Sequence, residues 1–247
     1  MVARDFRQRY IGSAAGWLWG LAQPLVLLLS YTFIFQVCLH QTLDPGEVTT
    51  NFPMFLFAGM LPWLLFSESV TRSASSIVEQ SNLITKTVFP AEMLPVAVFL
   101  STLIGHLLAV LLAMAGALIF LAHFSISILF LPLMMLFLAL FSIGIGWIVS
   151  SFQVYLRDTV QVLTVVLTFW FWLTPVFLSE RRYPARWRFL LAFNPLSYPV
   201  RAYRQALLGS FHPRISELLI SAALCGTVFL VGAMCFRYLK RGFADVL

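Results

Sequence analysis

The stretch SNLITKTVFPAEMLP, residues 81–95, is the longest polar interruption between two strongly apolar runs in the first half of the chain. Residues 52–66 before it and residues 96–121 after it are almost wholly apolar. The interruption carries the polar residues Asn82, Thr85, Lys86, Thr87 and Glu92. It is closed by Pro90 and Pro95. We expect a short helix here that lies outside a bilayer and faces a partner in the cytoplasm.

The composition supports this membrane setting. Of the 247 residues, 60% are hydrophobic and 11% are charged, and the mean hydropathy is +0.90. An ordinary soluble domain is about 45–50% apolar and about 25% charged. The apolar runs are long enough for transmembrane helices and lack the alternation, about 10 residues per strand, that is typical of an outer-membrane barrel. We therefore predict an all-α integral membrane protein with a single domain over residues 1–247.

Several function classes are disfavoured by what the chain carries. The net charge of +6 lies at the ends of apolar runs rather than in one stripe, which argues against nucleic acid as a partner. No G-x-x-x-x-G-K-[ST] stretch is present, and the only lysines, Lys86 and Lys240, are outside glycine-rich loops. Acidic residues are scattered singly, and Cys38, Cys225 and Cys235 have no metal-ligand spacing. We predict no catalytic residue, no metal site and no cofactor on this chain.

Six apolar runs predict about six transmembrane helices, at residues 19–39, 52–76, 96–121, 128–152, 159–178 and 215–236. The loop at residues 40–51 has no Lys or Arg, which places it outside the cytoplasm. Arg237, Lys240 and Arg241 follow the last run and indicate the cytoplasmic side. Both termini are therefore expected to be cytoplasmic.

Two segments are expected to lie at the membrane without crossing it. Residues 3–16 alternate apolar and charged positions at helical spacing, which predicts an amphipathic interfacial helix that serves as an anchor or as part of a gate. Residues 179–213 are rich in arginine although the span count places them outside. Their apolar run at 189–193 is too short to cross, and prolines divide the segment. We predict two re-entrant outer helices before the last span.

Three polar residues within the predicted spans have two interpretations each. Glu68 and Arg72 are four residues apart and could pair on one helix face, or one of them could contact a substrate. His106 could carry a proton or bind a ligand, or it could donate a hydrogen bond to a neighbouring helix. Gly144 and Gly146 in the fourth span predict a close helix approach.

The chain resembles a known family, the ABC-2 type permeases that export polysaccharides such as O-antigen, capsule or teichoic acid. The stretches that carry the resemblance are RDFRQRYIGSAAGWLWGLAQPL (4–25), FLFAGMLPWLLFSESV (55–70), NLITKTVFPAEMLP (82–95), and YLRDTVQVLTVVLTFWFWLTPV (155–176) followed by FNPLSYPVRAYRQALLG (193–209). Their order and spacing match from end to end.

The resemblance implies a division of labour between subunits. Residues 82–92 would form a coupling helix in a groove of a separate ABC ATPase, through Asn82, Leu83, Ile84, Lys86, Phe89 and Glu92. The interfacial or gate helix beside it would use Arg4, Phe6, Arg7, Arg9 and Tyr10. Two copies of the permease would form a homodimer above two ATPase copies that bind ATP and Mg. The substrate would be a lipid-linked glycan, and the location the bacterial inner membrane among its lipids.

Residues that could contact the glycan fall into two groups. The channel candidates are aromatic, because ring faces pack on sugar C–H faces, although lipid-facing or core packing is an equal alternative: Trp63, Phe66, Phe169, Trp170 and Trp172. The outer arginines could bind sugar acids or pyrophosphate, or lipid headgroups: Arg181, Arg182, Arg201 and Arg204. Alternative functions are an ABC-2 exporter of a small hydrophobic compound or lipid, a membrane-embedded transferase, and a passive scaffold.

Overall fold

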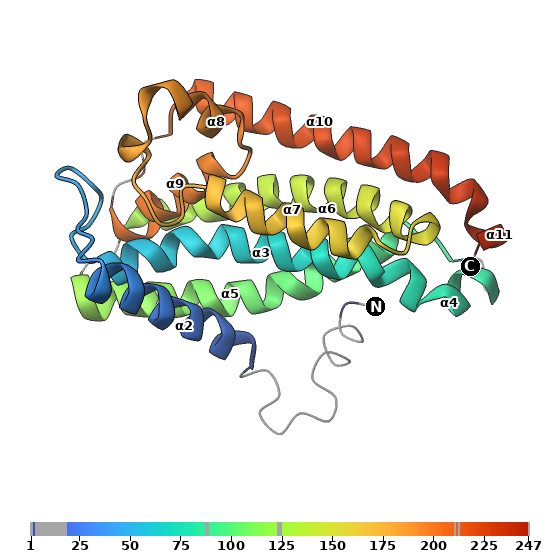
Figure 1. The fold of residues 1–247 in the computed structure, drawn as a ribbon, viewed down its shortest axis with the longest axis horizontal. Coiled ribbons are helices and arrows are strands. Elements are labelled where there is room, and N and C mark those ends of the chain that lie inside the picture. Colours follow the sequence, from blue (N-terminus) through green and yellow to red (C-terminus); the bar gives the residue numbers. More distant parts are fainter. Residues whose placement is uncertain are drawn as a thin grey trace.

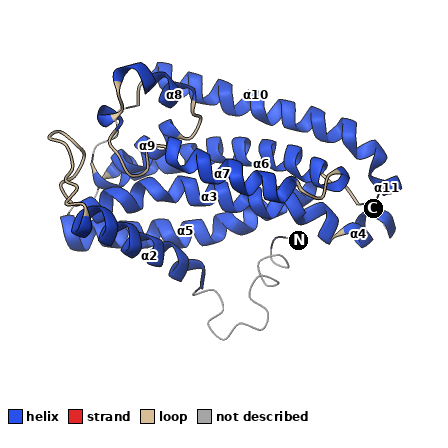
Figure 2. Cartoon of the chain, in the orientation of Figure 1, coloured by secondary structure: helices blue, strands red, loops and turns tan. Residues whose placement is uncertain are grey.

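The computed structural model describes residues 2, 19–86, 89–122, 125–209, 211 and 213–246. Within them the chain forms helices and loops and no strand (Figure 2). The predicted all-α class is therefore confirmed for the described part. The interfacial helix predicted at residues 3–16, with Arg4, Phe6, Arg7, Arg9 and Tyr10, lies outside the described residues.

The helices follow one another in an elongated bundle (Figure 1). In chain order they are α2 (Trp19–Thr32), the π-helical η2 (Phe33–Cys38), α3 (Phe52–Glu79), α4 (Ser81–Lys86), α5 (Met93–Leu121), η3 (Ile126–Phe130), α6 (Leu131–Tyr155), α7 (Thr159–Leu173), η4 (Glu180–Arg182), η5 (Ala185–Trp187), α8 (Arg188–Phe193), α9 (Ser197–Leu208), α10 (Ile215–Leu239), η6 (Lys240–Gly242) and α11 (Phe243–Val246).

Four helical stretches are long and apolar enough to cross a membrane among the described residues: Phe52–Glu79, Met93–Leu121, Ile126–Tyr155 and Ile215–Gly242. Two shorter apolar helices, Ala22–Cys38 and Thr159–Leu173, coincide with the other predicted spans. The helix α7 ends at Leu173 rather than at residue 178. Thr174 precedes Pro175 and adopts an extended conformation (φ −84°, ψ 136°), because the proline ring disfavours helical geometry in the residue before it.

The helix α3 forms the centre of the bundle and packs against α5, α6 and α9. Its start is well defined, since the Asn51 side chain accepts a hydrogen bond from the backbone N–H of Met54 and Pro53 occupies the first turn. The half of α3 that begins at Phe52 is apolar on all sides, and most of its residues are buried. A helix that is hydrophobic on all sides has to be covered by its neighbours, which explains this central position.

The crossing of α6 and α10 depends on glycine. A Cβ atom on Gly144 would lie 2.7 Å from the carbonyl oxygen of Val228, and one on Gly232 would collide with the backbone of Gly144. Gly146 faces α3, where its Cβ would lie 3.1 Å from the Ser73 side chain. The prediction that Gly144 and Gly146 permit close helix approach is confirmed, and each glycine serves a different neighbour.

The two ends of the bundle carry different elements (Figure 1). The helices α8 and α9 and the loop that follows η2 lie at one end, whereas α4 and α11 lie at the other. The arginine-rich segment at residues 179–213 contains two α-helices, as expected. The second of them, α9, is mostly buried against α3 and α6 and is therefore part of the core. We call the end with α8 and α9 the outer end and the end with α4 the inner end.

Candidate functional site

The predicted coupling segment starts with the short helix α4 at the inner end of the bundle. Asn82 is exposed on it, whereas Ile84 and Phe89 are partly buried. Both of these apolar side chains pack against a small buried cluster that is separate from the main core: Ile77, Ala91, Leu94, Val154, Phe236 and Phe243. The cluster contains residues of α3, α5, α6, α10 and α11, so the segment packs where five helices meet.

Glu92 attaches the end of this segment to the bundle through two hydrogen bonds. Its backbone carbonyl accepts a hydrogen bond from the indole N–H of Trp147 on α6, at 2.9 Å. Its carboxylate accepts one from the Lys240 ammonium at 2.6 Å, just after α10. This hydrogen bond is the main reason that the pKa of Glu92 lies below its ordinary value. Glu92 therefore connects the segment to the bundle.

The six predicted coupling residues thus separate by environment. Asn82 faces solvent, Ile84 and Phe89 face the bundle, and Glu92 pairs with Lys240. Leu83 is half-buried and already has a contact within the chain. The side chain of Lys86 is outside the described part of the structure.

At the outer end, the arginines Arg181 and Arg182 have partners in the loop after η2. Arg182 donates to the carboxylate of Asp44 at 2.9 Å and to the carbonyl of Thr42 at 2.6 Å. The Ser179 hydroxyl donates to the Glu47 carboxylate at 2.5 Å, and Arg181 donates to the carbonyl of Pro45 at 3.2 Å. The loop after η2 therefore folds onto the start of the arginine-rich segment.

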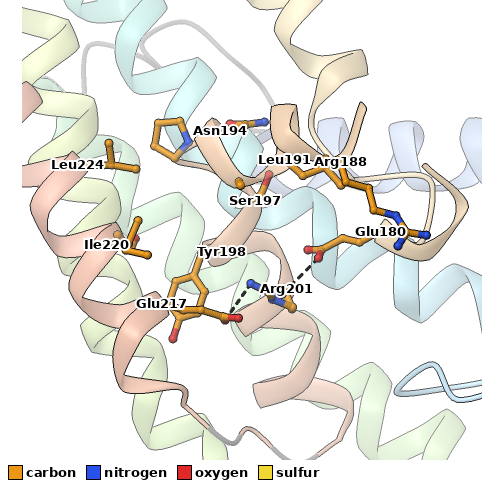
Figure 3. A pocket seen from close by; sticks show the side chains of 13 residues that line it. Glu180, Arg188, Leu191, Asn194, Ser197, Tyr198, Arg201, Glu217, Ile220 and Leu224 are labelled. Atoms are coloured by element: carbon orange, nitrogen blue, oxygen red, sulfur yellow. Dashed lines mark hydrogen bonds and ion pairs between the residues drawn. The ribbon is translucent and has the colours of Figure 1, made fainter. Parts of the chain in front are cut away.

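Arg201 on α9 lies between two carboxylates (Figure 3). It donates to Glu180 at 3.2 Å and to Glu217 at the start of α10 at 2.9 Å. Burial raises the pKa of Glu180 above its ordinary value, while the charges of Arg201 and Arg204 act in the opposite direction. This charged group connects η4, α9 and α10 in one place.

Arg204 has a different environment from the other outer arginines, because it is 5% exposed. Its Nε donates to the carbonyl of Phe55 at 3.1 Å and its Nη2 to the carbonyl of Val176 at 2.5 Å. The guanidinium carbon lies 3.6 Å from the centre of the Phe55 ring. Gly59 makes room for it, since a Cβ there would lie 2.6 Å from Nη2. Arg204 therefore attaches α9 to α3.

His106 and Arg72 inside the bundle also have partners. His106 on α5 forms a hydrogen bond of 2.9 Å with the hydroxyl of Tyr203 on α9, and both side chains are buried. Of the two interpretations of this histidine, the bond to a neighbouring helix is the one that the structure contains. Arg72 donates to the hydroxyl of Thr102 on α5 at 3.1 Å. Glu68 lines cavities beside the start of α2 together with Arg72 or His106.

The aromatic channel candidates do not share one surface. Trp63 and Phe66 are buried within the protomer. Trp170 is half-buried, packs on Phe66 and donates from its indole N–H to the side-chain oxygen of Asn194 at 3.0 Å. Phe169 is 67% exposed and Trp172 is 55% exposed. These two side chains on α7 are the candidates that the protomer leaves free to face a partner, a lipid or a channel.

Sequence reasoning missed several partners of the outer arginines. Asp44, Glu180 and Glu217 belong to separate stretches, and nothing in their local sequence marks them as a group. Asp44 and Glu180 lie in segments that were expected outside, and Glu217 lies at the start of the last predicted span, residues 215–236. Their position near an excess of arginine was the available signal. Among the described residues, no group of three or more His, Cys, Asp or Glu is placed to hold a metal ion.

Comparison with known proteins gives consistent results. The family model for the ABC-2 type transporter matches residues 1–208. The chain is 29% identical over 247 residues to an O-antigen export system permease protein RfbA of Myxococcus xanthus, covering 99% of this chain and 93% of that protein. It is 26% identical to an RfbA of Klebsiella pneumoniae, covering 99% and 92%. It is 27% identical to the polysialic acid transport protein KpsM of Escherichia coli, covering 96% and 91%.

Proposed function

Because this chain belongs to the ABC-2 type transporter family, we propose that it is the membrane permease of a bacterial ABC exporter of polysaccharide. One observation carries the proposal: the chain aligns over almost its whole length with permeases named for O-antigen export and with polysialic acid transport proteins. The expected substrate is a lipid-linked glycan, and the expected complex contains two permeases and two ATPase subunits.

The inner end supplies the proposed route for energy. In this scheme, α4 sits in a groove of the ATPase, and ATP and Mg are bound by that partner. Ile84, Phe89 and Glu92 transmit its movement to the bundle, because they contact helices from both halves of the chain. Asn82 is exposed and is available for the partner.

The proposed topology has six crossings of the inner membrane, with both termini in the cytoplasm. Support comes from α2 and η2, which together run from Trp19 to Cys38, and from α7 as the shorter crossing. A helix of 15 residues such as α7 spans about 22 Å of an apolar layer that is about 30 Å thick. The outer helices α8 and α9 would occupy the remaining depth on that side.

A labelling experiment tests the topology. Cys38 is exposed at the outer end, and the other cysteines, Cys225 and Cys235, can be replaced by serine. In intact spheroplasts, a membrane-impermeant maleimide should label Cys38. Labelling that appears only after the membrane is permeabilised would show that the orientation is reversed.

Two experiments test the function. Deleting the gene should abolish surface polysaccharide and cause glycan to accumulate inside the cell. Unchanged surface polysaccharide would contradict the proposal, and drug sensitivity with normal glycan would favour a small-molecule exporter instead. The second experiment is co-purification with ATPase candidates. A variant with Leu83→Pro and Lys86→Glu should insert normally but lose stimulated ATP hydrolysis and export, and normal export by it would refute the coupling assignment.

A further inference from the structure

The outer end contains a cavity of about 280 Å³ between α8, α9 and the start of α10. Figure 3 shows the side chains that surround it. Leu191, Ile220 and Leu224 contribute apolar surface to it, and the charged group around Arg201 also lines it. Pockets that hold small ligands usually measure about 300–1,000 Å³. This cavity lies just below that range, so it could hold one ring or one end of a longer molecule.

Polar atoms without partners gather around this cavity. In the described part of the chain, the Ser197 hydroxyl, the Tyr198 hydroxyl and the Oε1 atom of Glu180 are buried and have no hydrogen-bond partner. All three residues line the cavity with other atoms, because the unpartnered oxygens themselves have almost no accessible surface. Ser197 is only 5% exposed and Tyr198 only 8%. Buried polar groups are nearly always hydrogen-bonded, so a set of unpartnered ones around one cavity indicates that something else supplies the bonds.

The charges around the cavity do not favour an anion. Arg201 is occupied by the carboxylates of Glu180 and Glu217. Arg188 donates through Nε to the carbonyl of Tyr183 at 3.1 Å and through Nη2 to the carbonyl of Arg181 at 3.0 Å. The two arginines and two glutamates that line the cavity cancel in charge. A phosphate would therefore meet two carboxylates without gaining a dedicated cation.

The remaining chemistry fits a neutral, hydroxyl-rich ring. Two hydroxyls can each donate and accept a hydrogen bond, and the free carboxylate oxygen of Glu180 can accept one from a ligand hydroxyl. The apolar residues Ile220 and Leu224, which are neighbours on α10, can pack against a C–H face. A sugar ring offers this combination of hydroxyl edges and an apolar face.

We propose that the cavity between α8, α9 and α10 binds one neutral sugar ring at the outer end of the permease, and that the side chains of Ser197, Tyr198 and Glu180 turn their unpartnered oxygens toward it. The choice of a sugar among polyhydroxylated molecules rests on the proposed export of polysaccharide. The ring could belong to the glycan chain or to the headgroup of a glycolipid, and the chemistry of the site is the same for both. The site would hold the glycan as it leaves the bundle.

The test is direct binding to the full-length chain in phosphatidylcholine nanodiscs. Saturation-transfer NMR with methyl glucoside, methyl galactoside and N-acetylglucosamine, and with methyl glucuronide as an anionic counterpart, would report contact with the ring protons. We expect at least one neutral sugar to bind, and methyl glucuronide to bind more weakly. Maltotriose and galactosyl diacylglycerol added to the discs then distinguish a chain segment from a lipid headgroup.

Matched variants connect the signal to the cavity. Ser197→Ala with Tyr198→Phe removes two hydroxyls and should weaken binding about tenfold or more. Ser142→Ala is the control, because that hydroxyl on α6 is equally buried and unpartnered but does not line the cavity. Ala192→Trp fills the cavity from α8, and it carries the test if the double variant does not insert.

The outcomes separate this inference from the proposed function. Absence of neutral-sugar binding, or binding that the cavity variants leave unchanged, overturns the inference even if deletion of the gene abolishes surface polysaccharide. Sugar binding that depends on the cavity supports the inference, even if deletion leaves surface polysaccharide intact and the export proposal fails.

Discussion

Replacing Arg204 with methionine should destabilise the protein strongly, because this buried side chain links α9 to α3. The change removes the donors to the carbonyls of Phe55 and Val176 and the contact with the Phe55 ring. Hydrogen bonds to a charged group contribute about 1.5–3 kcal/mol each, and a desolvated cation–π contact about 2 kcal/mol. Release of the guanidinium from its own desolvation cost offsets part of this.

The expected net loss is about 2–4 kcal/mol. For a chain of this size, each kcal/mol lowers the unfolding midpoint by about 2–4 °C, so Arg204→Met should lower it by about 4–16 °C. The assay is thermal unfolding of the purified protein in nanodiscs, followed by intrinsic fluorescence. Arg204→Lys should give an intermediate value, since a single ammonium cannot reproduce the planar fork of donors.

The control is Arg186→Met at the same end of the molecule. Arg186 is exposed in η5, with its guanidinium carbon 5.8 Å from the centre of the Trp187 ring, and surface substitutions of this kind change stability by about 0.5 kcal/mol or less. Equal shifts of the midpoint for the two variants would refute the reasoning. The attachment of α9 to α3 would then have to come from apolar packing alone.

Three further predictions concern other contacts. Gly232→Ala should cost about 1–3 kcal/mol by forcing α10 away from α6, whereas Gly226→Ala, which meets no neighbour, should be neutral in the same unfolding assay. Lys240→Met should lower the unfolding midpoint at neutral pH. That difference should fade as the pH falls below about 4.5 and through the depressed pKa of Glu92, because the carboxylate loses its charge there; a difference independent of pH would contradict the pairing. Tyr203→Phe should cost about 1 kcal/mol by leaving the buried imidazole on α5 without its partner, and an unchanged midpoint would show that this bond adds no stability.

Much of the fold could be predicted because it depends on local composition. Long apolar runs become helices wherever water is excluded, since every backbone polar group must then be satisfied within the segment. The breaks at residues 40–51, 81–95 and 179–213 were equally visible, because prolines and charges interrupt the apolar runs. The end of α7 was placed too late because the apolar residues after Pro175 were included, although the helix stops before that proline.

The candidate sites were predicted less completely. The sequence indicated that the arginines of the outer segment matter, but not that Arg204 is buried whereas Arg182 pairs with Asp44. It identified aromatic candidates for a channel, but exposure separates Phe169 and Trp172 from the buried ones. Residue type determines what a side chain can do, and only the neighbouring helices determine which of those possibilities is realised.

Sequence by itself determined the membrane setting, the alternation of apolar and polar segments, and the family, because these follow from transfer free energies and from ordered motifs along the chain. Tertiary structure alone decided the connections between distant segments. Glu92 meets Lys240 across 148 positions, and Arg204 reaches the Phe55 carbonyl across 149. Such pairs form because the central α3 brings the two halves of the chain together, and a contact between residues so far apart leaves no periodic signal in the sequence.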